Sequence, residues 1–206
     1  MNRPLAAAAL ALLVALSPGC ARKEIRGEVS TGLDRKLSTF AFIEDGDLVA
    51  FIVDVRATQY REKDAYIPFE VAIANRGFRS MTLTRESFVL VDEQGNRYPA
   101  ASPKELLQGY EFLDLDRRLA EISDITFNKF STFTRYRSKF SPTRQVPQVP
   151  GEATLVQDTV VLPKFGYLID FLYFPTPPGG VKGKKFEMFL KTPELPDAVY
   201  VKFQVN

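Results

Sequence analysis

The stretch from Tyr66 to Tyr98 most constrains the fold of this chain, because runs of alternating apolar residues within it are separated by turn signals. The first run carries four apolar residues on one face: Ile67, Phe69, Val71 and Ile73. Asn75-Arg76-Gly77 tolerates the positive φ angles of a chain reversal, and Gly95-Asn96 indicates a hairpin. Pro68 has the opposite parity and donates no ladder hydrogen bond, so it indicates an edge strand or a gap in the ladder. The stretch therefore predicts the strand-and-turn unit of an antiparallel β-sandwich.

Period-two patterns elsewhere in the chain add further strands. They lie at 47–57, 153–162, 167–174, 186–190 and 199–205. The composition agrees, because 17 Phe and 8 Tyr favour strands while 14 Pro and 12 Gly favour turns. We predict a mainly β protein, an immunoglobulin-like antiparallel β-sandwich of about seven strands or more.

Several of these segments resemble a known family. Ile67–Asn75 is a hydrophobic strand that ends in N-x-G, and Leu83, Phe88–Asp92 and a G-x-x-Y close at Gly95 and Tyr98 follow it. A later strand, YLIDFLYFPTPPGG, carries the pattern L-x-F-x-x-P. Together these segments resemble the telokin-like, immunoglobulin-fold domain of bacterial lipoproteins. The resemblance implies a scaffold and no chemistry, because most members of that family have no known function.

The N-terminal residues predict export and a lipid anchor. Arg3 precedes the apolar run Leu5–Leu16, which is too short to cross a hydrocarbon core of about 30 Å. Cys20 follows at the position where a bacterial lipoprotein signal is cleaved and acylated, although Ser17 stands where that signal usually has Leu. An ordinary secretory signal with a chance cysteine is the alternative. By the same resemblance, Ala21 favours the periplasmic face of the outer membrane if the source is Gram-negative.

These signals divide the chain into three parts. We expect a signal peptide at 1–19, a tether at 20–37, and a β-sandwich at 38–206 with an insertion at about 102–150.

The insertion begins with a helix signal. Ser102-Pro103-Lys104-Glu105 is a capping box with proline at the first helical position. One apolar stripe follows at helical spacing: Phe112, Leu115, Leu119 and Ile122. We predict a helix, or two short ones, at about 103–123.

A basic and aromatic segment follows, and from Ile125 to Gly151 it contains no acidic residue. Its candidate partner-binding or membrane-binding residues are Phe127, Lys129, Phe130, Phe133, Arg135, Tyr136, Arg137, Lys139, Phe140 and Arg144. The spacing suits a helix and the composition suits extended structure, so both remain open. Such a surface suits lipid headgroups, an anionic polymer or an envelope protein. In the alternative interpretation, the rings pack onto the sandwich and the charges face water.

Absent residue types restrict the chemistry. The chain has no His and one Cys, which excludes a His-containing catalytic triad, an intramolecular disulfide and a cysteine-based zinc site. The acidic turn at 44–47 matches no EF-hand, and we expect no metal and no cofactor. The net charge of +2 and the export signal argue against a nucleic-acid partner.

Three aspartates need a separate interpretation. Asp170 is the one charge within its predicted strand, and it is either a buried functional group or a half-exposed residue paired with a basic residue across the sheet. Asp114 and Asp116 fall on the predicted helix, where we expect them to be solvated. The sequence thus predicts a non-enzymatic, lipid-anchored protein of the cell envelope, either a binding module or an envelope-accessory module, of unknown ligand. An enzyme that acts on envelope polymers through carboxylates is the alternative.

Overall fold

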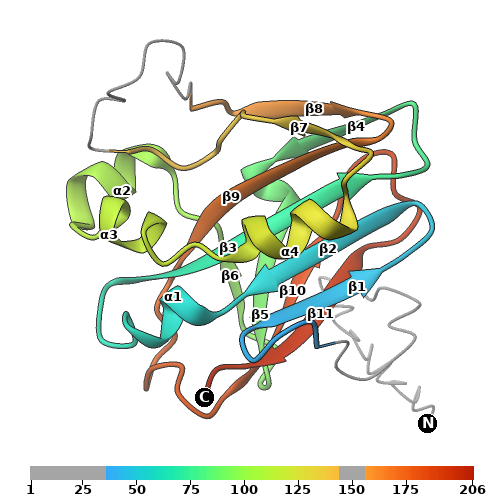
Figure 1. Cartoon of the computed structure of the whole chain (residues 1–206). Coiled ribbons are helices and arrows are strands. Elements are labelled where there is room, and N and C mark those ends of the chain that lie inside the picture. Colours follow the sequence, from blue (N-terminus) through green and yellow to red (C-terminus); the bar gives the residue numbers. More distant parts are fainter. Residues whose placement is uncertain (1–35, 144–155) are drawn as a thin grey trace, which may run out of the picture.

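Two facing sheets form the body of the protein in the computed structural model, which describes residues 36–143 and 156–206 (Figure 1). Sheet A has the order β1-β2-β3-β9-β7, with strands Ala41–Asp45, Val49–Asp54, Tyr66–Asn75, Gly166–Pro175 and Thr134–Tyr136. Sheet C has the order β11-β10-β5-β6, with strands Val199–Gln204, Lys185–Leu190, Phe88–Asp92 and Arg97–Pro99. A ribbon of β4 and β8 completes the fold, with strands Ser80–Thr84 and Thr159–Pro163.

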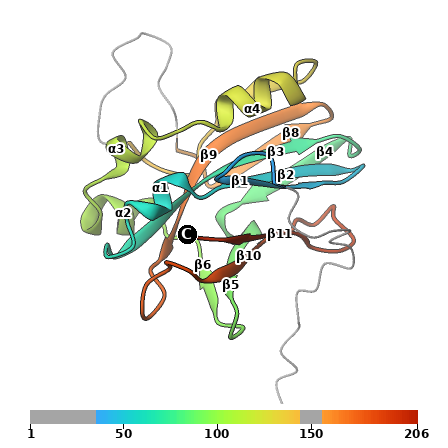
Figure 2. The same cartoon turned by 60° about the horizontal axis from the view of Figure 1, so that its bottom comes forward.

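The predicted β-sandwich is confirmed, with one exception to its antiparallel pairing. Figure 2 shows sheet C below sheet A, and the apolar residues that both sheets turn inward form the main core. Phe69 of β3 and Phe203 of β11 meet there with ring centroids 5.3 Å apart. The exception is β7, which pairs parallel to β9 from Thr134↔Gly166 onward.

Pro68 occupies the predicted gap in the ladder. The pairing of β3 with β2 stops at Glu70, while its pairing with β9 continues to Tyr66. Beyond Glu70, the short helix α1 (Arg56–Gln59) lies beside β3 in place of β2. Thr58 of this helix donates its hydroxyl hydrogen to the carbonyl of Pro68. The proline therefore sits where no donor is needed.

The predicted hairpin at Gly95-Asn96 joins β5 to β6, and Gly95 has the positive φ of 80° that this turn requires. The carboxylate of Asp92 accepts hydrogen bonds from the backbone N–H groups of Gln94 and Asn96 and from the hydroxyl of Tyr98. This G-x-x-Y close is therefore a turn held by one aspartate.

The insertion forms three short helices, and the first two confirm the prediction of two short helices at about 103–123. The three are α2 (Pro103–Gly109), α3 (Leu113–Arg117) and α4 (Ile122–Lys129), and a 3-10 turn, η1 (Arg85–Ser87), lies earlier in the chain. The predicted capping box is present, with the Ser102 hydroxyl accepting from the Glu105 N–H at 3.3 Å. The single apolar stripe was wrong, because α3 ends at Arg117 and α4 begins at Ile122, so the four residues do not share one helix. Leu115 is 46% exposed, while Leu113 of the same helix is buried.

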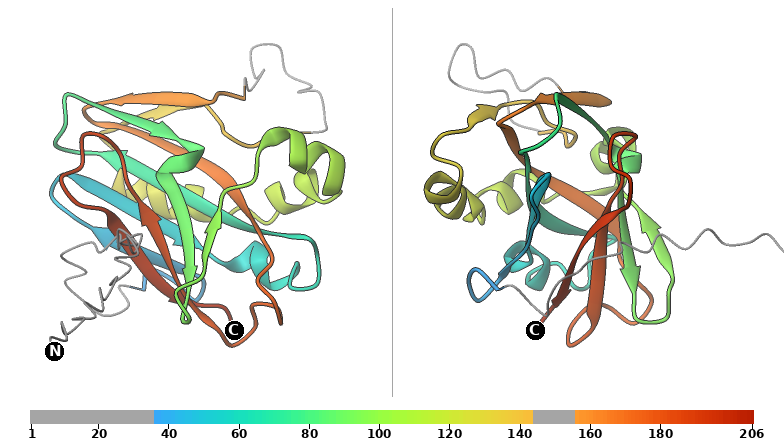
Figure 3. Two further views of the ribbon diagram at one scale, coloured as in Figure 1. Left: turned by 180° about the vertical axis from the view of Figure 1, so that it is seen from behind. Right: turned by 90° about the vertical axis from the view of Figure 1, so that its right-hand side faces the viewer.

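Helix α4 covers the face of sheet A that points away from sheet C, so the protein has three layers (Figure 3). Four alanines of β1, β2 and β3 lie beneath it: Ala41, Ala50, Ala72 and Ala74. These small residues let Ile122 and Phe130 approach the sheet closely. Helices α2 and α3 cover the other end of the same face through Tyr110 and Leu113. In the described ranges, no helix is long and apolar enough to cross a membrane.

Two phenylalanines of the basic and aromatic segment have opposite environments, and this difference is testable. Phe140 is 1% exposed and its ring contacts Phe88 in the main core, whereas Phe127 on α4 is 72% exposed. We expect Phe140→Ala to lower the free energy of unfolding by about 3–5 kcal/mol, since it leaves a cavity in the core. Phe127→Ala, the matched control, should change it by less than about 0.5 kcal/mol. Urea denaturation of both variants measures this difference, and equal losses would contradict the placement of the two rings.

Candidate functional site

The structure separates the aromatic candidates of the basic and aromatic segment into buried and exposed rings. Phe130 and Phe140 are 1% exposed and belong to the second and the main core clusters. Phe133 is partly buried against the second cluster, and Tyr136 packs against the main core. Phe127 faces solvent. The interpretation in which the rings pack onto the sandwich therefore holds for four of these five rings.

The basic candidates are placed mainly toward solvent. Lys129 donates to Asp45 at 2.7 Å, which ties the end of α4 to β1. Arg135 and Arg137 on and after β7 are exposed, and Lys139 is half-buried. Arg144 lies outside the described residues.

A second exposed aromatic, Phe165, lies beside this segment. It occupies the turn between β8 and β9, is 51% exposed, and packs edge-to-face on Phe133 with ring centroids 5.4 Å apart. The ammonium of Lys164 lies 5.2 Å from the Phe165 ring centroid. The backbone N–H of Lys164 donates to the carbonyl of Arg79, which brings the β3–β4 turn to the same place.

We call Arg79, Phe133, Arg135, Lys164 and Phe165 the aromatic–basic rim. Arg79, Arg135 and Lys164 are exposed. The three segments that form the rim, 76–84, 131–141 and 159–166, contain no acidic residue. The sequence indicated the middle segment by its composition. It did not indicate Lys164 and Phe165, because they stand between two strands as an ordinary turn and come close to Phe133 only through the β7–β9 pairing.

Four carboxylates form a different candidate site, because each is buried: Asp54, Glu70, Asp116 and Asp170. Buried acids with raised pKa values are frequent at catalytic sites, so each of them needs an explanation.

Asp170 is fully buried in β9, so the expectation of a half-exposed residue was wrong. Its carboxylate accepts the backbone N–H groups of Phe140 at 2.6 Å and Ser141 at 3.1 Å. Its charged neighbour is Arg117 of α3 at 3.7 Å, rather than a residue across the sheet. Burial raises the pKa of Asp170, while Arg117 and the two N–H groups act to lower it. The aspartate therefore fastens the segment after β7 to the sandwich.

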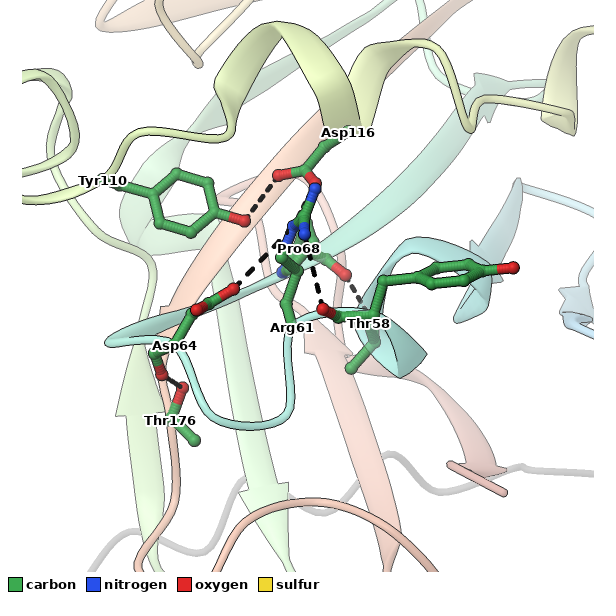
Figure 4. A network of polar contacts seen from close by, with 8 residues as sticks. Thr58, Arg61, Asp64, Pro68, Tyr110, Asp116 and Thr176 are labelled. Atoms are coloured by element: carbon green, nitrogen blue, oxygen red, sulfur yellow. Dashed lines mark hydrogen bonds and ion pairs between the residues drawn. The ribbon is translucent and has the colours of Figure 1, made fainter.

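Asp116 is also fully buried, which corrects the expectation of a solvated side chain. Figure 4 shows it between Arg61, whose Nε donates at 2.7 Å, and Tyr110, whose hydroxyl donates at 2.5 Å. Burial raises the pKa of Asp116 despite both donors. Asp114 is partly buried, and it accepts a hydrogen bond from the Thr143 hydroxyl. This network joins α2 and α3 to the chain after α1.

Glu70 of β3 and Asp54 of β2 face each other across the sheet. Glu70 accepts the backbone N–H groups of Glu121 at 2.9 Å and Ile122 at 3.0 Å, and so caps the start of α4. Burial, assisted by the charges of Asp54 and Asp170, raises the pKa of Glu70 to about 8, although the Ile122 N–H and Arg135 act to lower it. Burial also raises the pKa of Asp54, which accepts the N–H of Arg56.

All four acids thus bond to backbone N–H groups or to buried donors within the fold. A cleft of about 690 Å³ lies at the β5–β6 hairpin end of the sandwich, and a second cleft of about 210 Å³ lies beside α1. Neither is lined by any of the four. Among the residues that the structure describes, no group of three acidic, histidine or cysteine side chains is placed to hold a metal. This arrangement supports structural roles for the acids and leaves the rim as the candidate functional site.

Comparison with known proteins gives little beyond this geometry. No protein-family model matches the chain, and no curated protein matches it. Two similar solved structures come from Bacillus subtilis. One is of a "putative lipoprotein (ycdA)", with 13% identity and a TM-score of 0.41 over 79% of this chain and 38% of that one. The other is the yjhA protein, with 9% identity and a TM-score of 0.39 over 80% and 96%.

This chain spans only about 38% of the length of the first neighbour. Likeness at such identity and TM-score leaves the function to be argued from the residues of this chain.

The raised pKa of Glu70 predicts a pH dependence of stability. A carboxyl group whose pKa is about 8 in the folded state and 4.5 in its ordinary state stabilises the fold fully below about pH 4.5. That contribution is lost as the pH rises toward about 8. Glu70→Gln keeps an acceptor for the α4 N–H groups and cannot ionise. We therefore expect the variant to gain stability relative to the wild type between about pH 5 and pH 8.

Urea unfolding at several pH values measures this gain. Glu111→Gln is the matched control, because Glu111 is exposed in the same insertion and its replacement should leave the wild-type profile unchanged. Parallel profiles for Glu70→Gln and the wild type would contradict the assignment.

Proposed function

We propose that this protein is a lipid-anchored component of a cell envelope that binds a partner through the aromatic–basic rim and catalyses no reaction. The observation that carries the proposal is the rim itself. It combines a half-exposed phenylalanine with three exposed cations on segments without acidic residues. Folding buries Phe130 and Phe140 and partly buries Phe133 and Tyr136, whereas the Phe165 ring, packed on Phe133, remains half in solvent.

The anchor is proposed from the sequence, because Cys20 lies outside the described residues. Two or three acyl chains on this cysteine would hold the protein on a membrane durably, since each buried CH₂ contributes about 0.8 kcal/mol. The telokin-like, immunoglobulin-fold scaffold proposed for residues 38–206 would then present its turns to envelope partners. A location on the periplasmic face of the outer membrane belongs to the same proposal for a Gram-negative source.

The alternative, an enzyme that acts on envelope polymers through carboxylates, has weaker support. Its best candidates, Asp116 and Asp170, have raised pKa values, as catalytic acids often do. The oxygens of Asp116 accept from Arg61 and Tyr110, and Asp170 accepts backbone N–H groups with Oδ2 and has Arg117 3.7 Å from Oδ1. Neither residue lines a described cleft. A polymer substrate needs an open approach to its acid, so we favour the binding module.

Replacement of Cys20 tests the anchor. Cys20→Ala removes the only thiol, so we expect the variant to lose palmitate labelling and to leave the membrane fraction. Ser30→Ala, a change within the predicted tether, is the matched control and should stay labelled and membrane-bound. Fractionation with radiolabelled palmitate measures both properties. A Cys20→Ala protein that remains labelled and sediments with membranes would refute the proposed anchor.

A further inference from the structure

Phe165 has a backbone conformation that its side chain disfavours. Among the described residues it is the only non-glycine residue with a positive φ, at 61°. This region is uncommon for non-glycine residues and is a genuine outlier for bulky ones. Such conformations persist only where neighbouring structure holds them.

Two neighbouring elements hold Phe165 in place. Its N–H donates to the carbonyl of Asn75 at 2.7 Å, and its carbonyl accepts from the N–H of Thr134 at 2.9 Å. Both bonds involve only the backbone of Phe165, so a glycine would complete the same turn with less strain. The aromatic ring is therefore not required by the turn that carries it, and half of it faces solvent.

The three segments next to this ring carry cations and no acidic residue. Lys164 lies over it, Arg79 is joined to Lys164 through the backbone, and Arg135 follows Thr134 on β7. Cations next to an exposed aromatic ring suit the boundary between lipid phosphates and acyl chains, where the ring meets the chains and the cations meet the phosphates.

The length of the chain before the structure allows this contact. Fifteen residues separate Cys20 from Lys36, where the described structure begins, and the sixteen steps between these two residues span at most about 55 Å. A domain of this size is about 40 Å across. The anchor therefore does not restrict which face of the domain contacts the bilayer. The surface chemistry of the domain can determine that face. Figure 1 shows the β8–β9 turn at the end of the molecule opposite the β5–β6 hairpin. Residues of that hairpin line the larger cleft.

We propose that the aromatic–basic rim docks on an anionic lipid bilayer, with the Phe165 ring at the level of the headgroups and Arg79, Arg135 and Lys164 on lipid phosphates. This inference rests on the proposed function for the anchor alone. Each cation near an anionic surface strengthens binding about fivefold. Docking would hold the domain against the membrane in one orientation and leave its opposite end free.

The test uses the absence of tryptophan from the chain, since Phe165→Trp introduces a single indole. The full-length acylated variant is placed in vesicles of phosphatidylcholine with about 30% phosphatidylglycerol, which carry bromine on their acyl chains. Tyr60→Trp is the matched control, because Tyr60 is 63% exposed and follows α1 at the other end of β3. We expect the Phe165→Trp emission to shift to the blue and to be quenched roughly threefold more than the control.

Two further measurements decide the electrostatic part. Charge reversal of Arg79, Arg135 and Lys164 in the Phe165→Trp chain should abolish the excess quenching while the circular dichroism stays unchanged. Without any charge reversal, about 1 M NaCl shortens the Debye length to about 3 Å and should also abolish the excess quenching. Excess quenching that survives high salt overturns the role of the cations.

The remaining outcomes separate this inference from the proposed function. Equal quenching of the two tryptophan variants in anchored protein overturns the lipid contact and leaves the anchor standing. If the purified chain lacks acyl groups, the proposed anchor fails, and adding Phe165→Trp protein to preformed vesicles still decides the contact. A Phe165→Trp emission shift with a soluble anionic polymer and none with vesicles would assign the rim to that polymer and refute the lipid proposal.

Discussion

The fold depends on the burial of both faces of β3 and β9. All but one of the ten residues in each strand are buried, between sheet C on one side and helices α2, α3 and α4 on the other. A strand buried on both faces gains apolar burial twice, but any charge on it must find a partner inside the protein. Glu70 and Asp170 are the charges on these strands, and backbone N–H groups of the insertion supply their partners. The insertion and the sheet are therefore interdependent, because removing either would leave the other with unpaired groups or exposed core.

The same constraint explains the large share of the sequence given to the insertion. A sandwich of sheets A and C alone would leave the outer face of sheet A in water, with Ile52 and Ile169 exposed. Helix α4 covers that face, and Lys129 and Glu70 hold its two ends through Asp45 and through the helix N–H groups. Because Glu70 is more easily protonated than an exposed glutamate, the hold at the start of α4 varies with pH. This is a physical consequence of using a buried acid as a helix cap.

The sequence predicted the strands and turns well, because a period of two and turn residues are local signals. It predicted the helical stripe less well, since the chain leaves the helix after Arg117 and starts a new one at Ile122, and Leu115 is exposed. It also assigned Asp116 to water, and for Asp170 it left open a buried functional group or a half-exposed residue with a cross-strand pair. Their partners Arg61 and Arg117 lie far away in sequence or on another element, so no local pattern could reveal them. A signal for double burial existed in the nearly continuous apolar run of β9, which period-two counting alone does not register.

The sequence predicted only part of the candidate site, because the rim combines segments that are distant in the sequence. Composition identified the segment that contains Phe133 and Arg135, but the structure adds Lys164 and Phe165 through the parallel pairing of β7 with β9. That pairing also supplies the hydrogen bond from Thr134 that holds Phe165 in its strained conformation. The element that brings the rim together is thus the one that keeps its exposed ring in place. A partner would meet a preformed surface, and little conformational entropy would be lost when it binds.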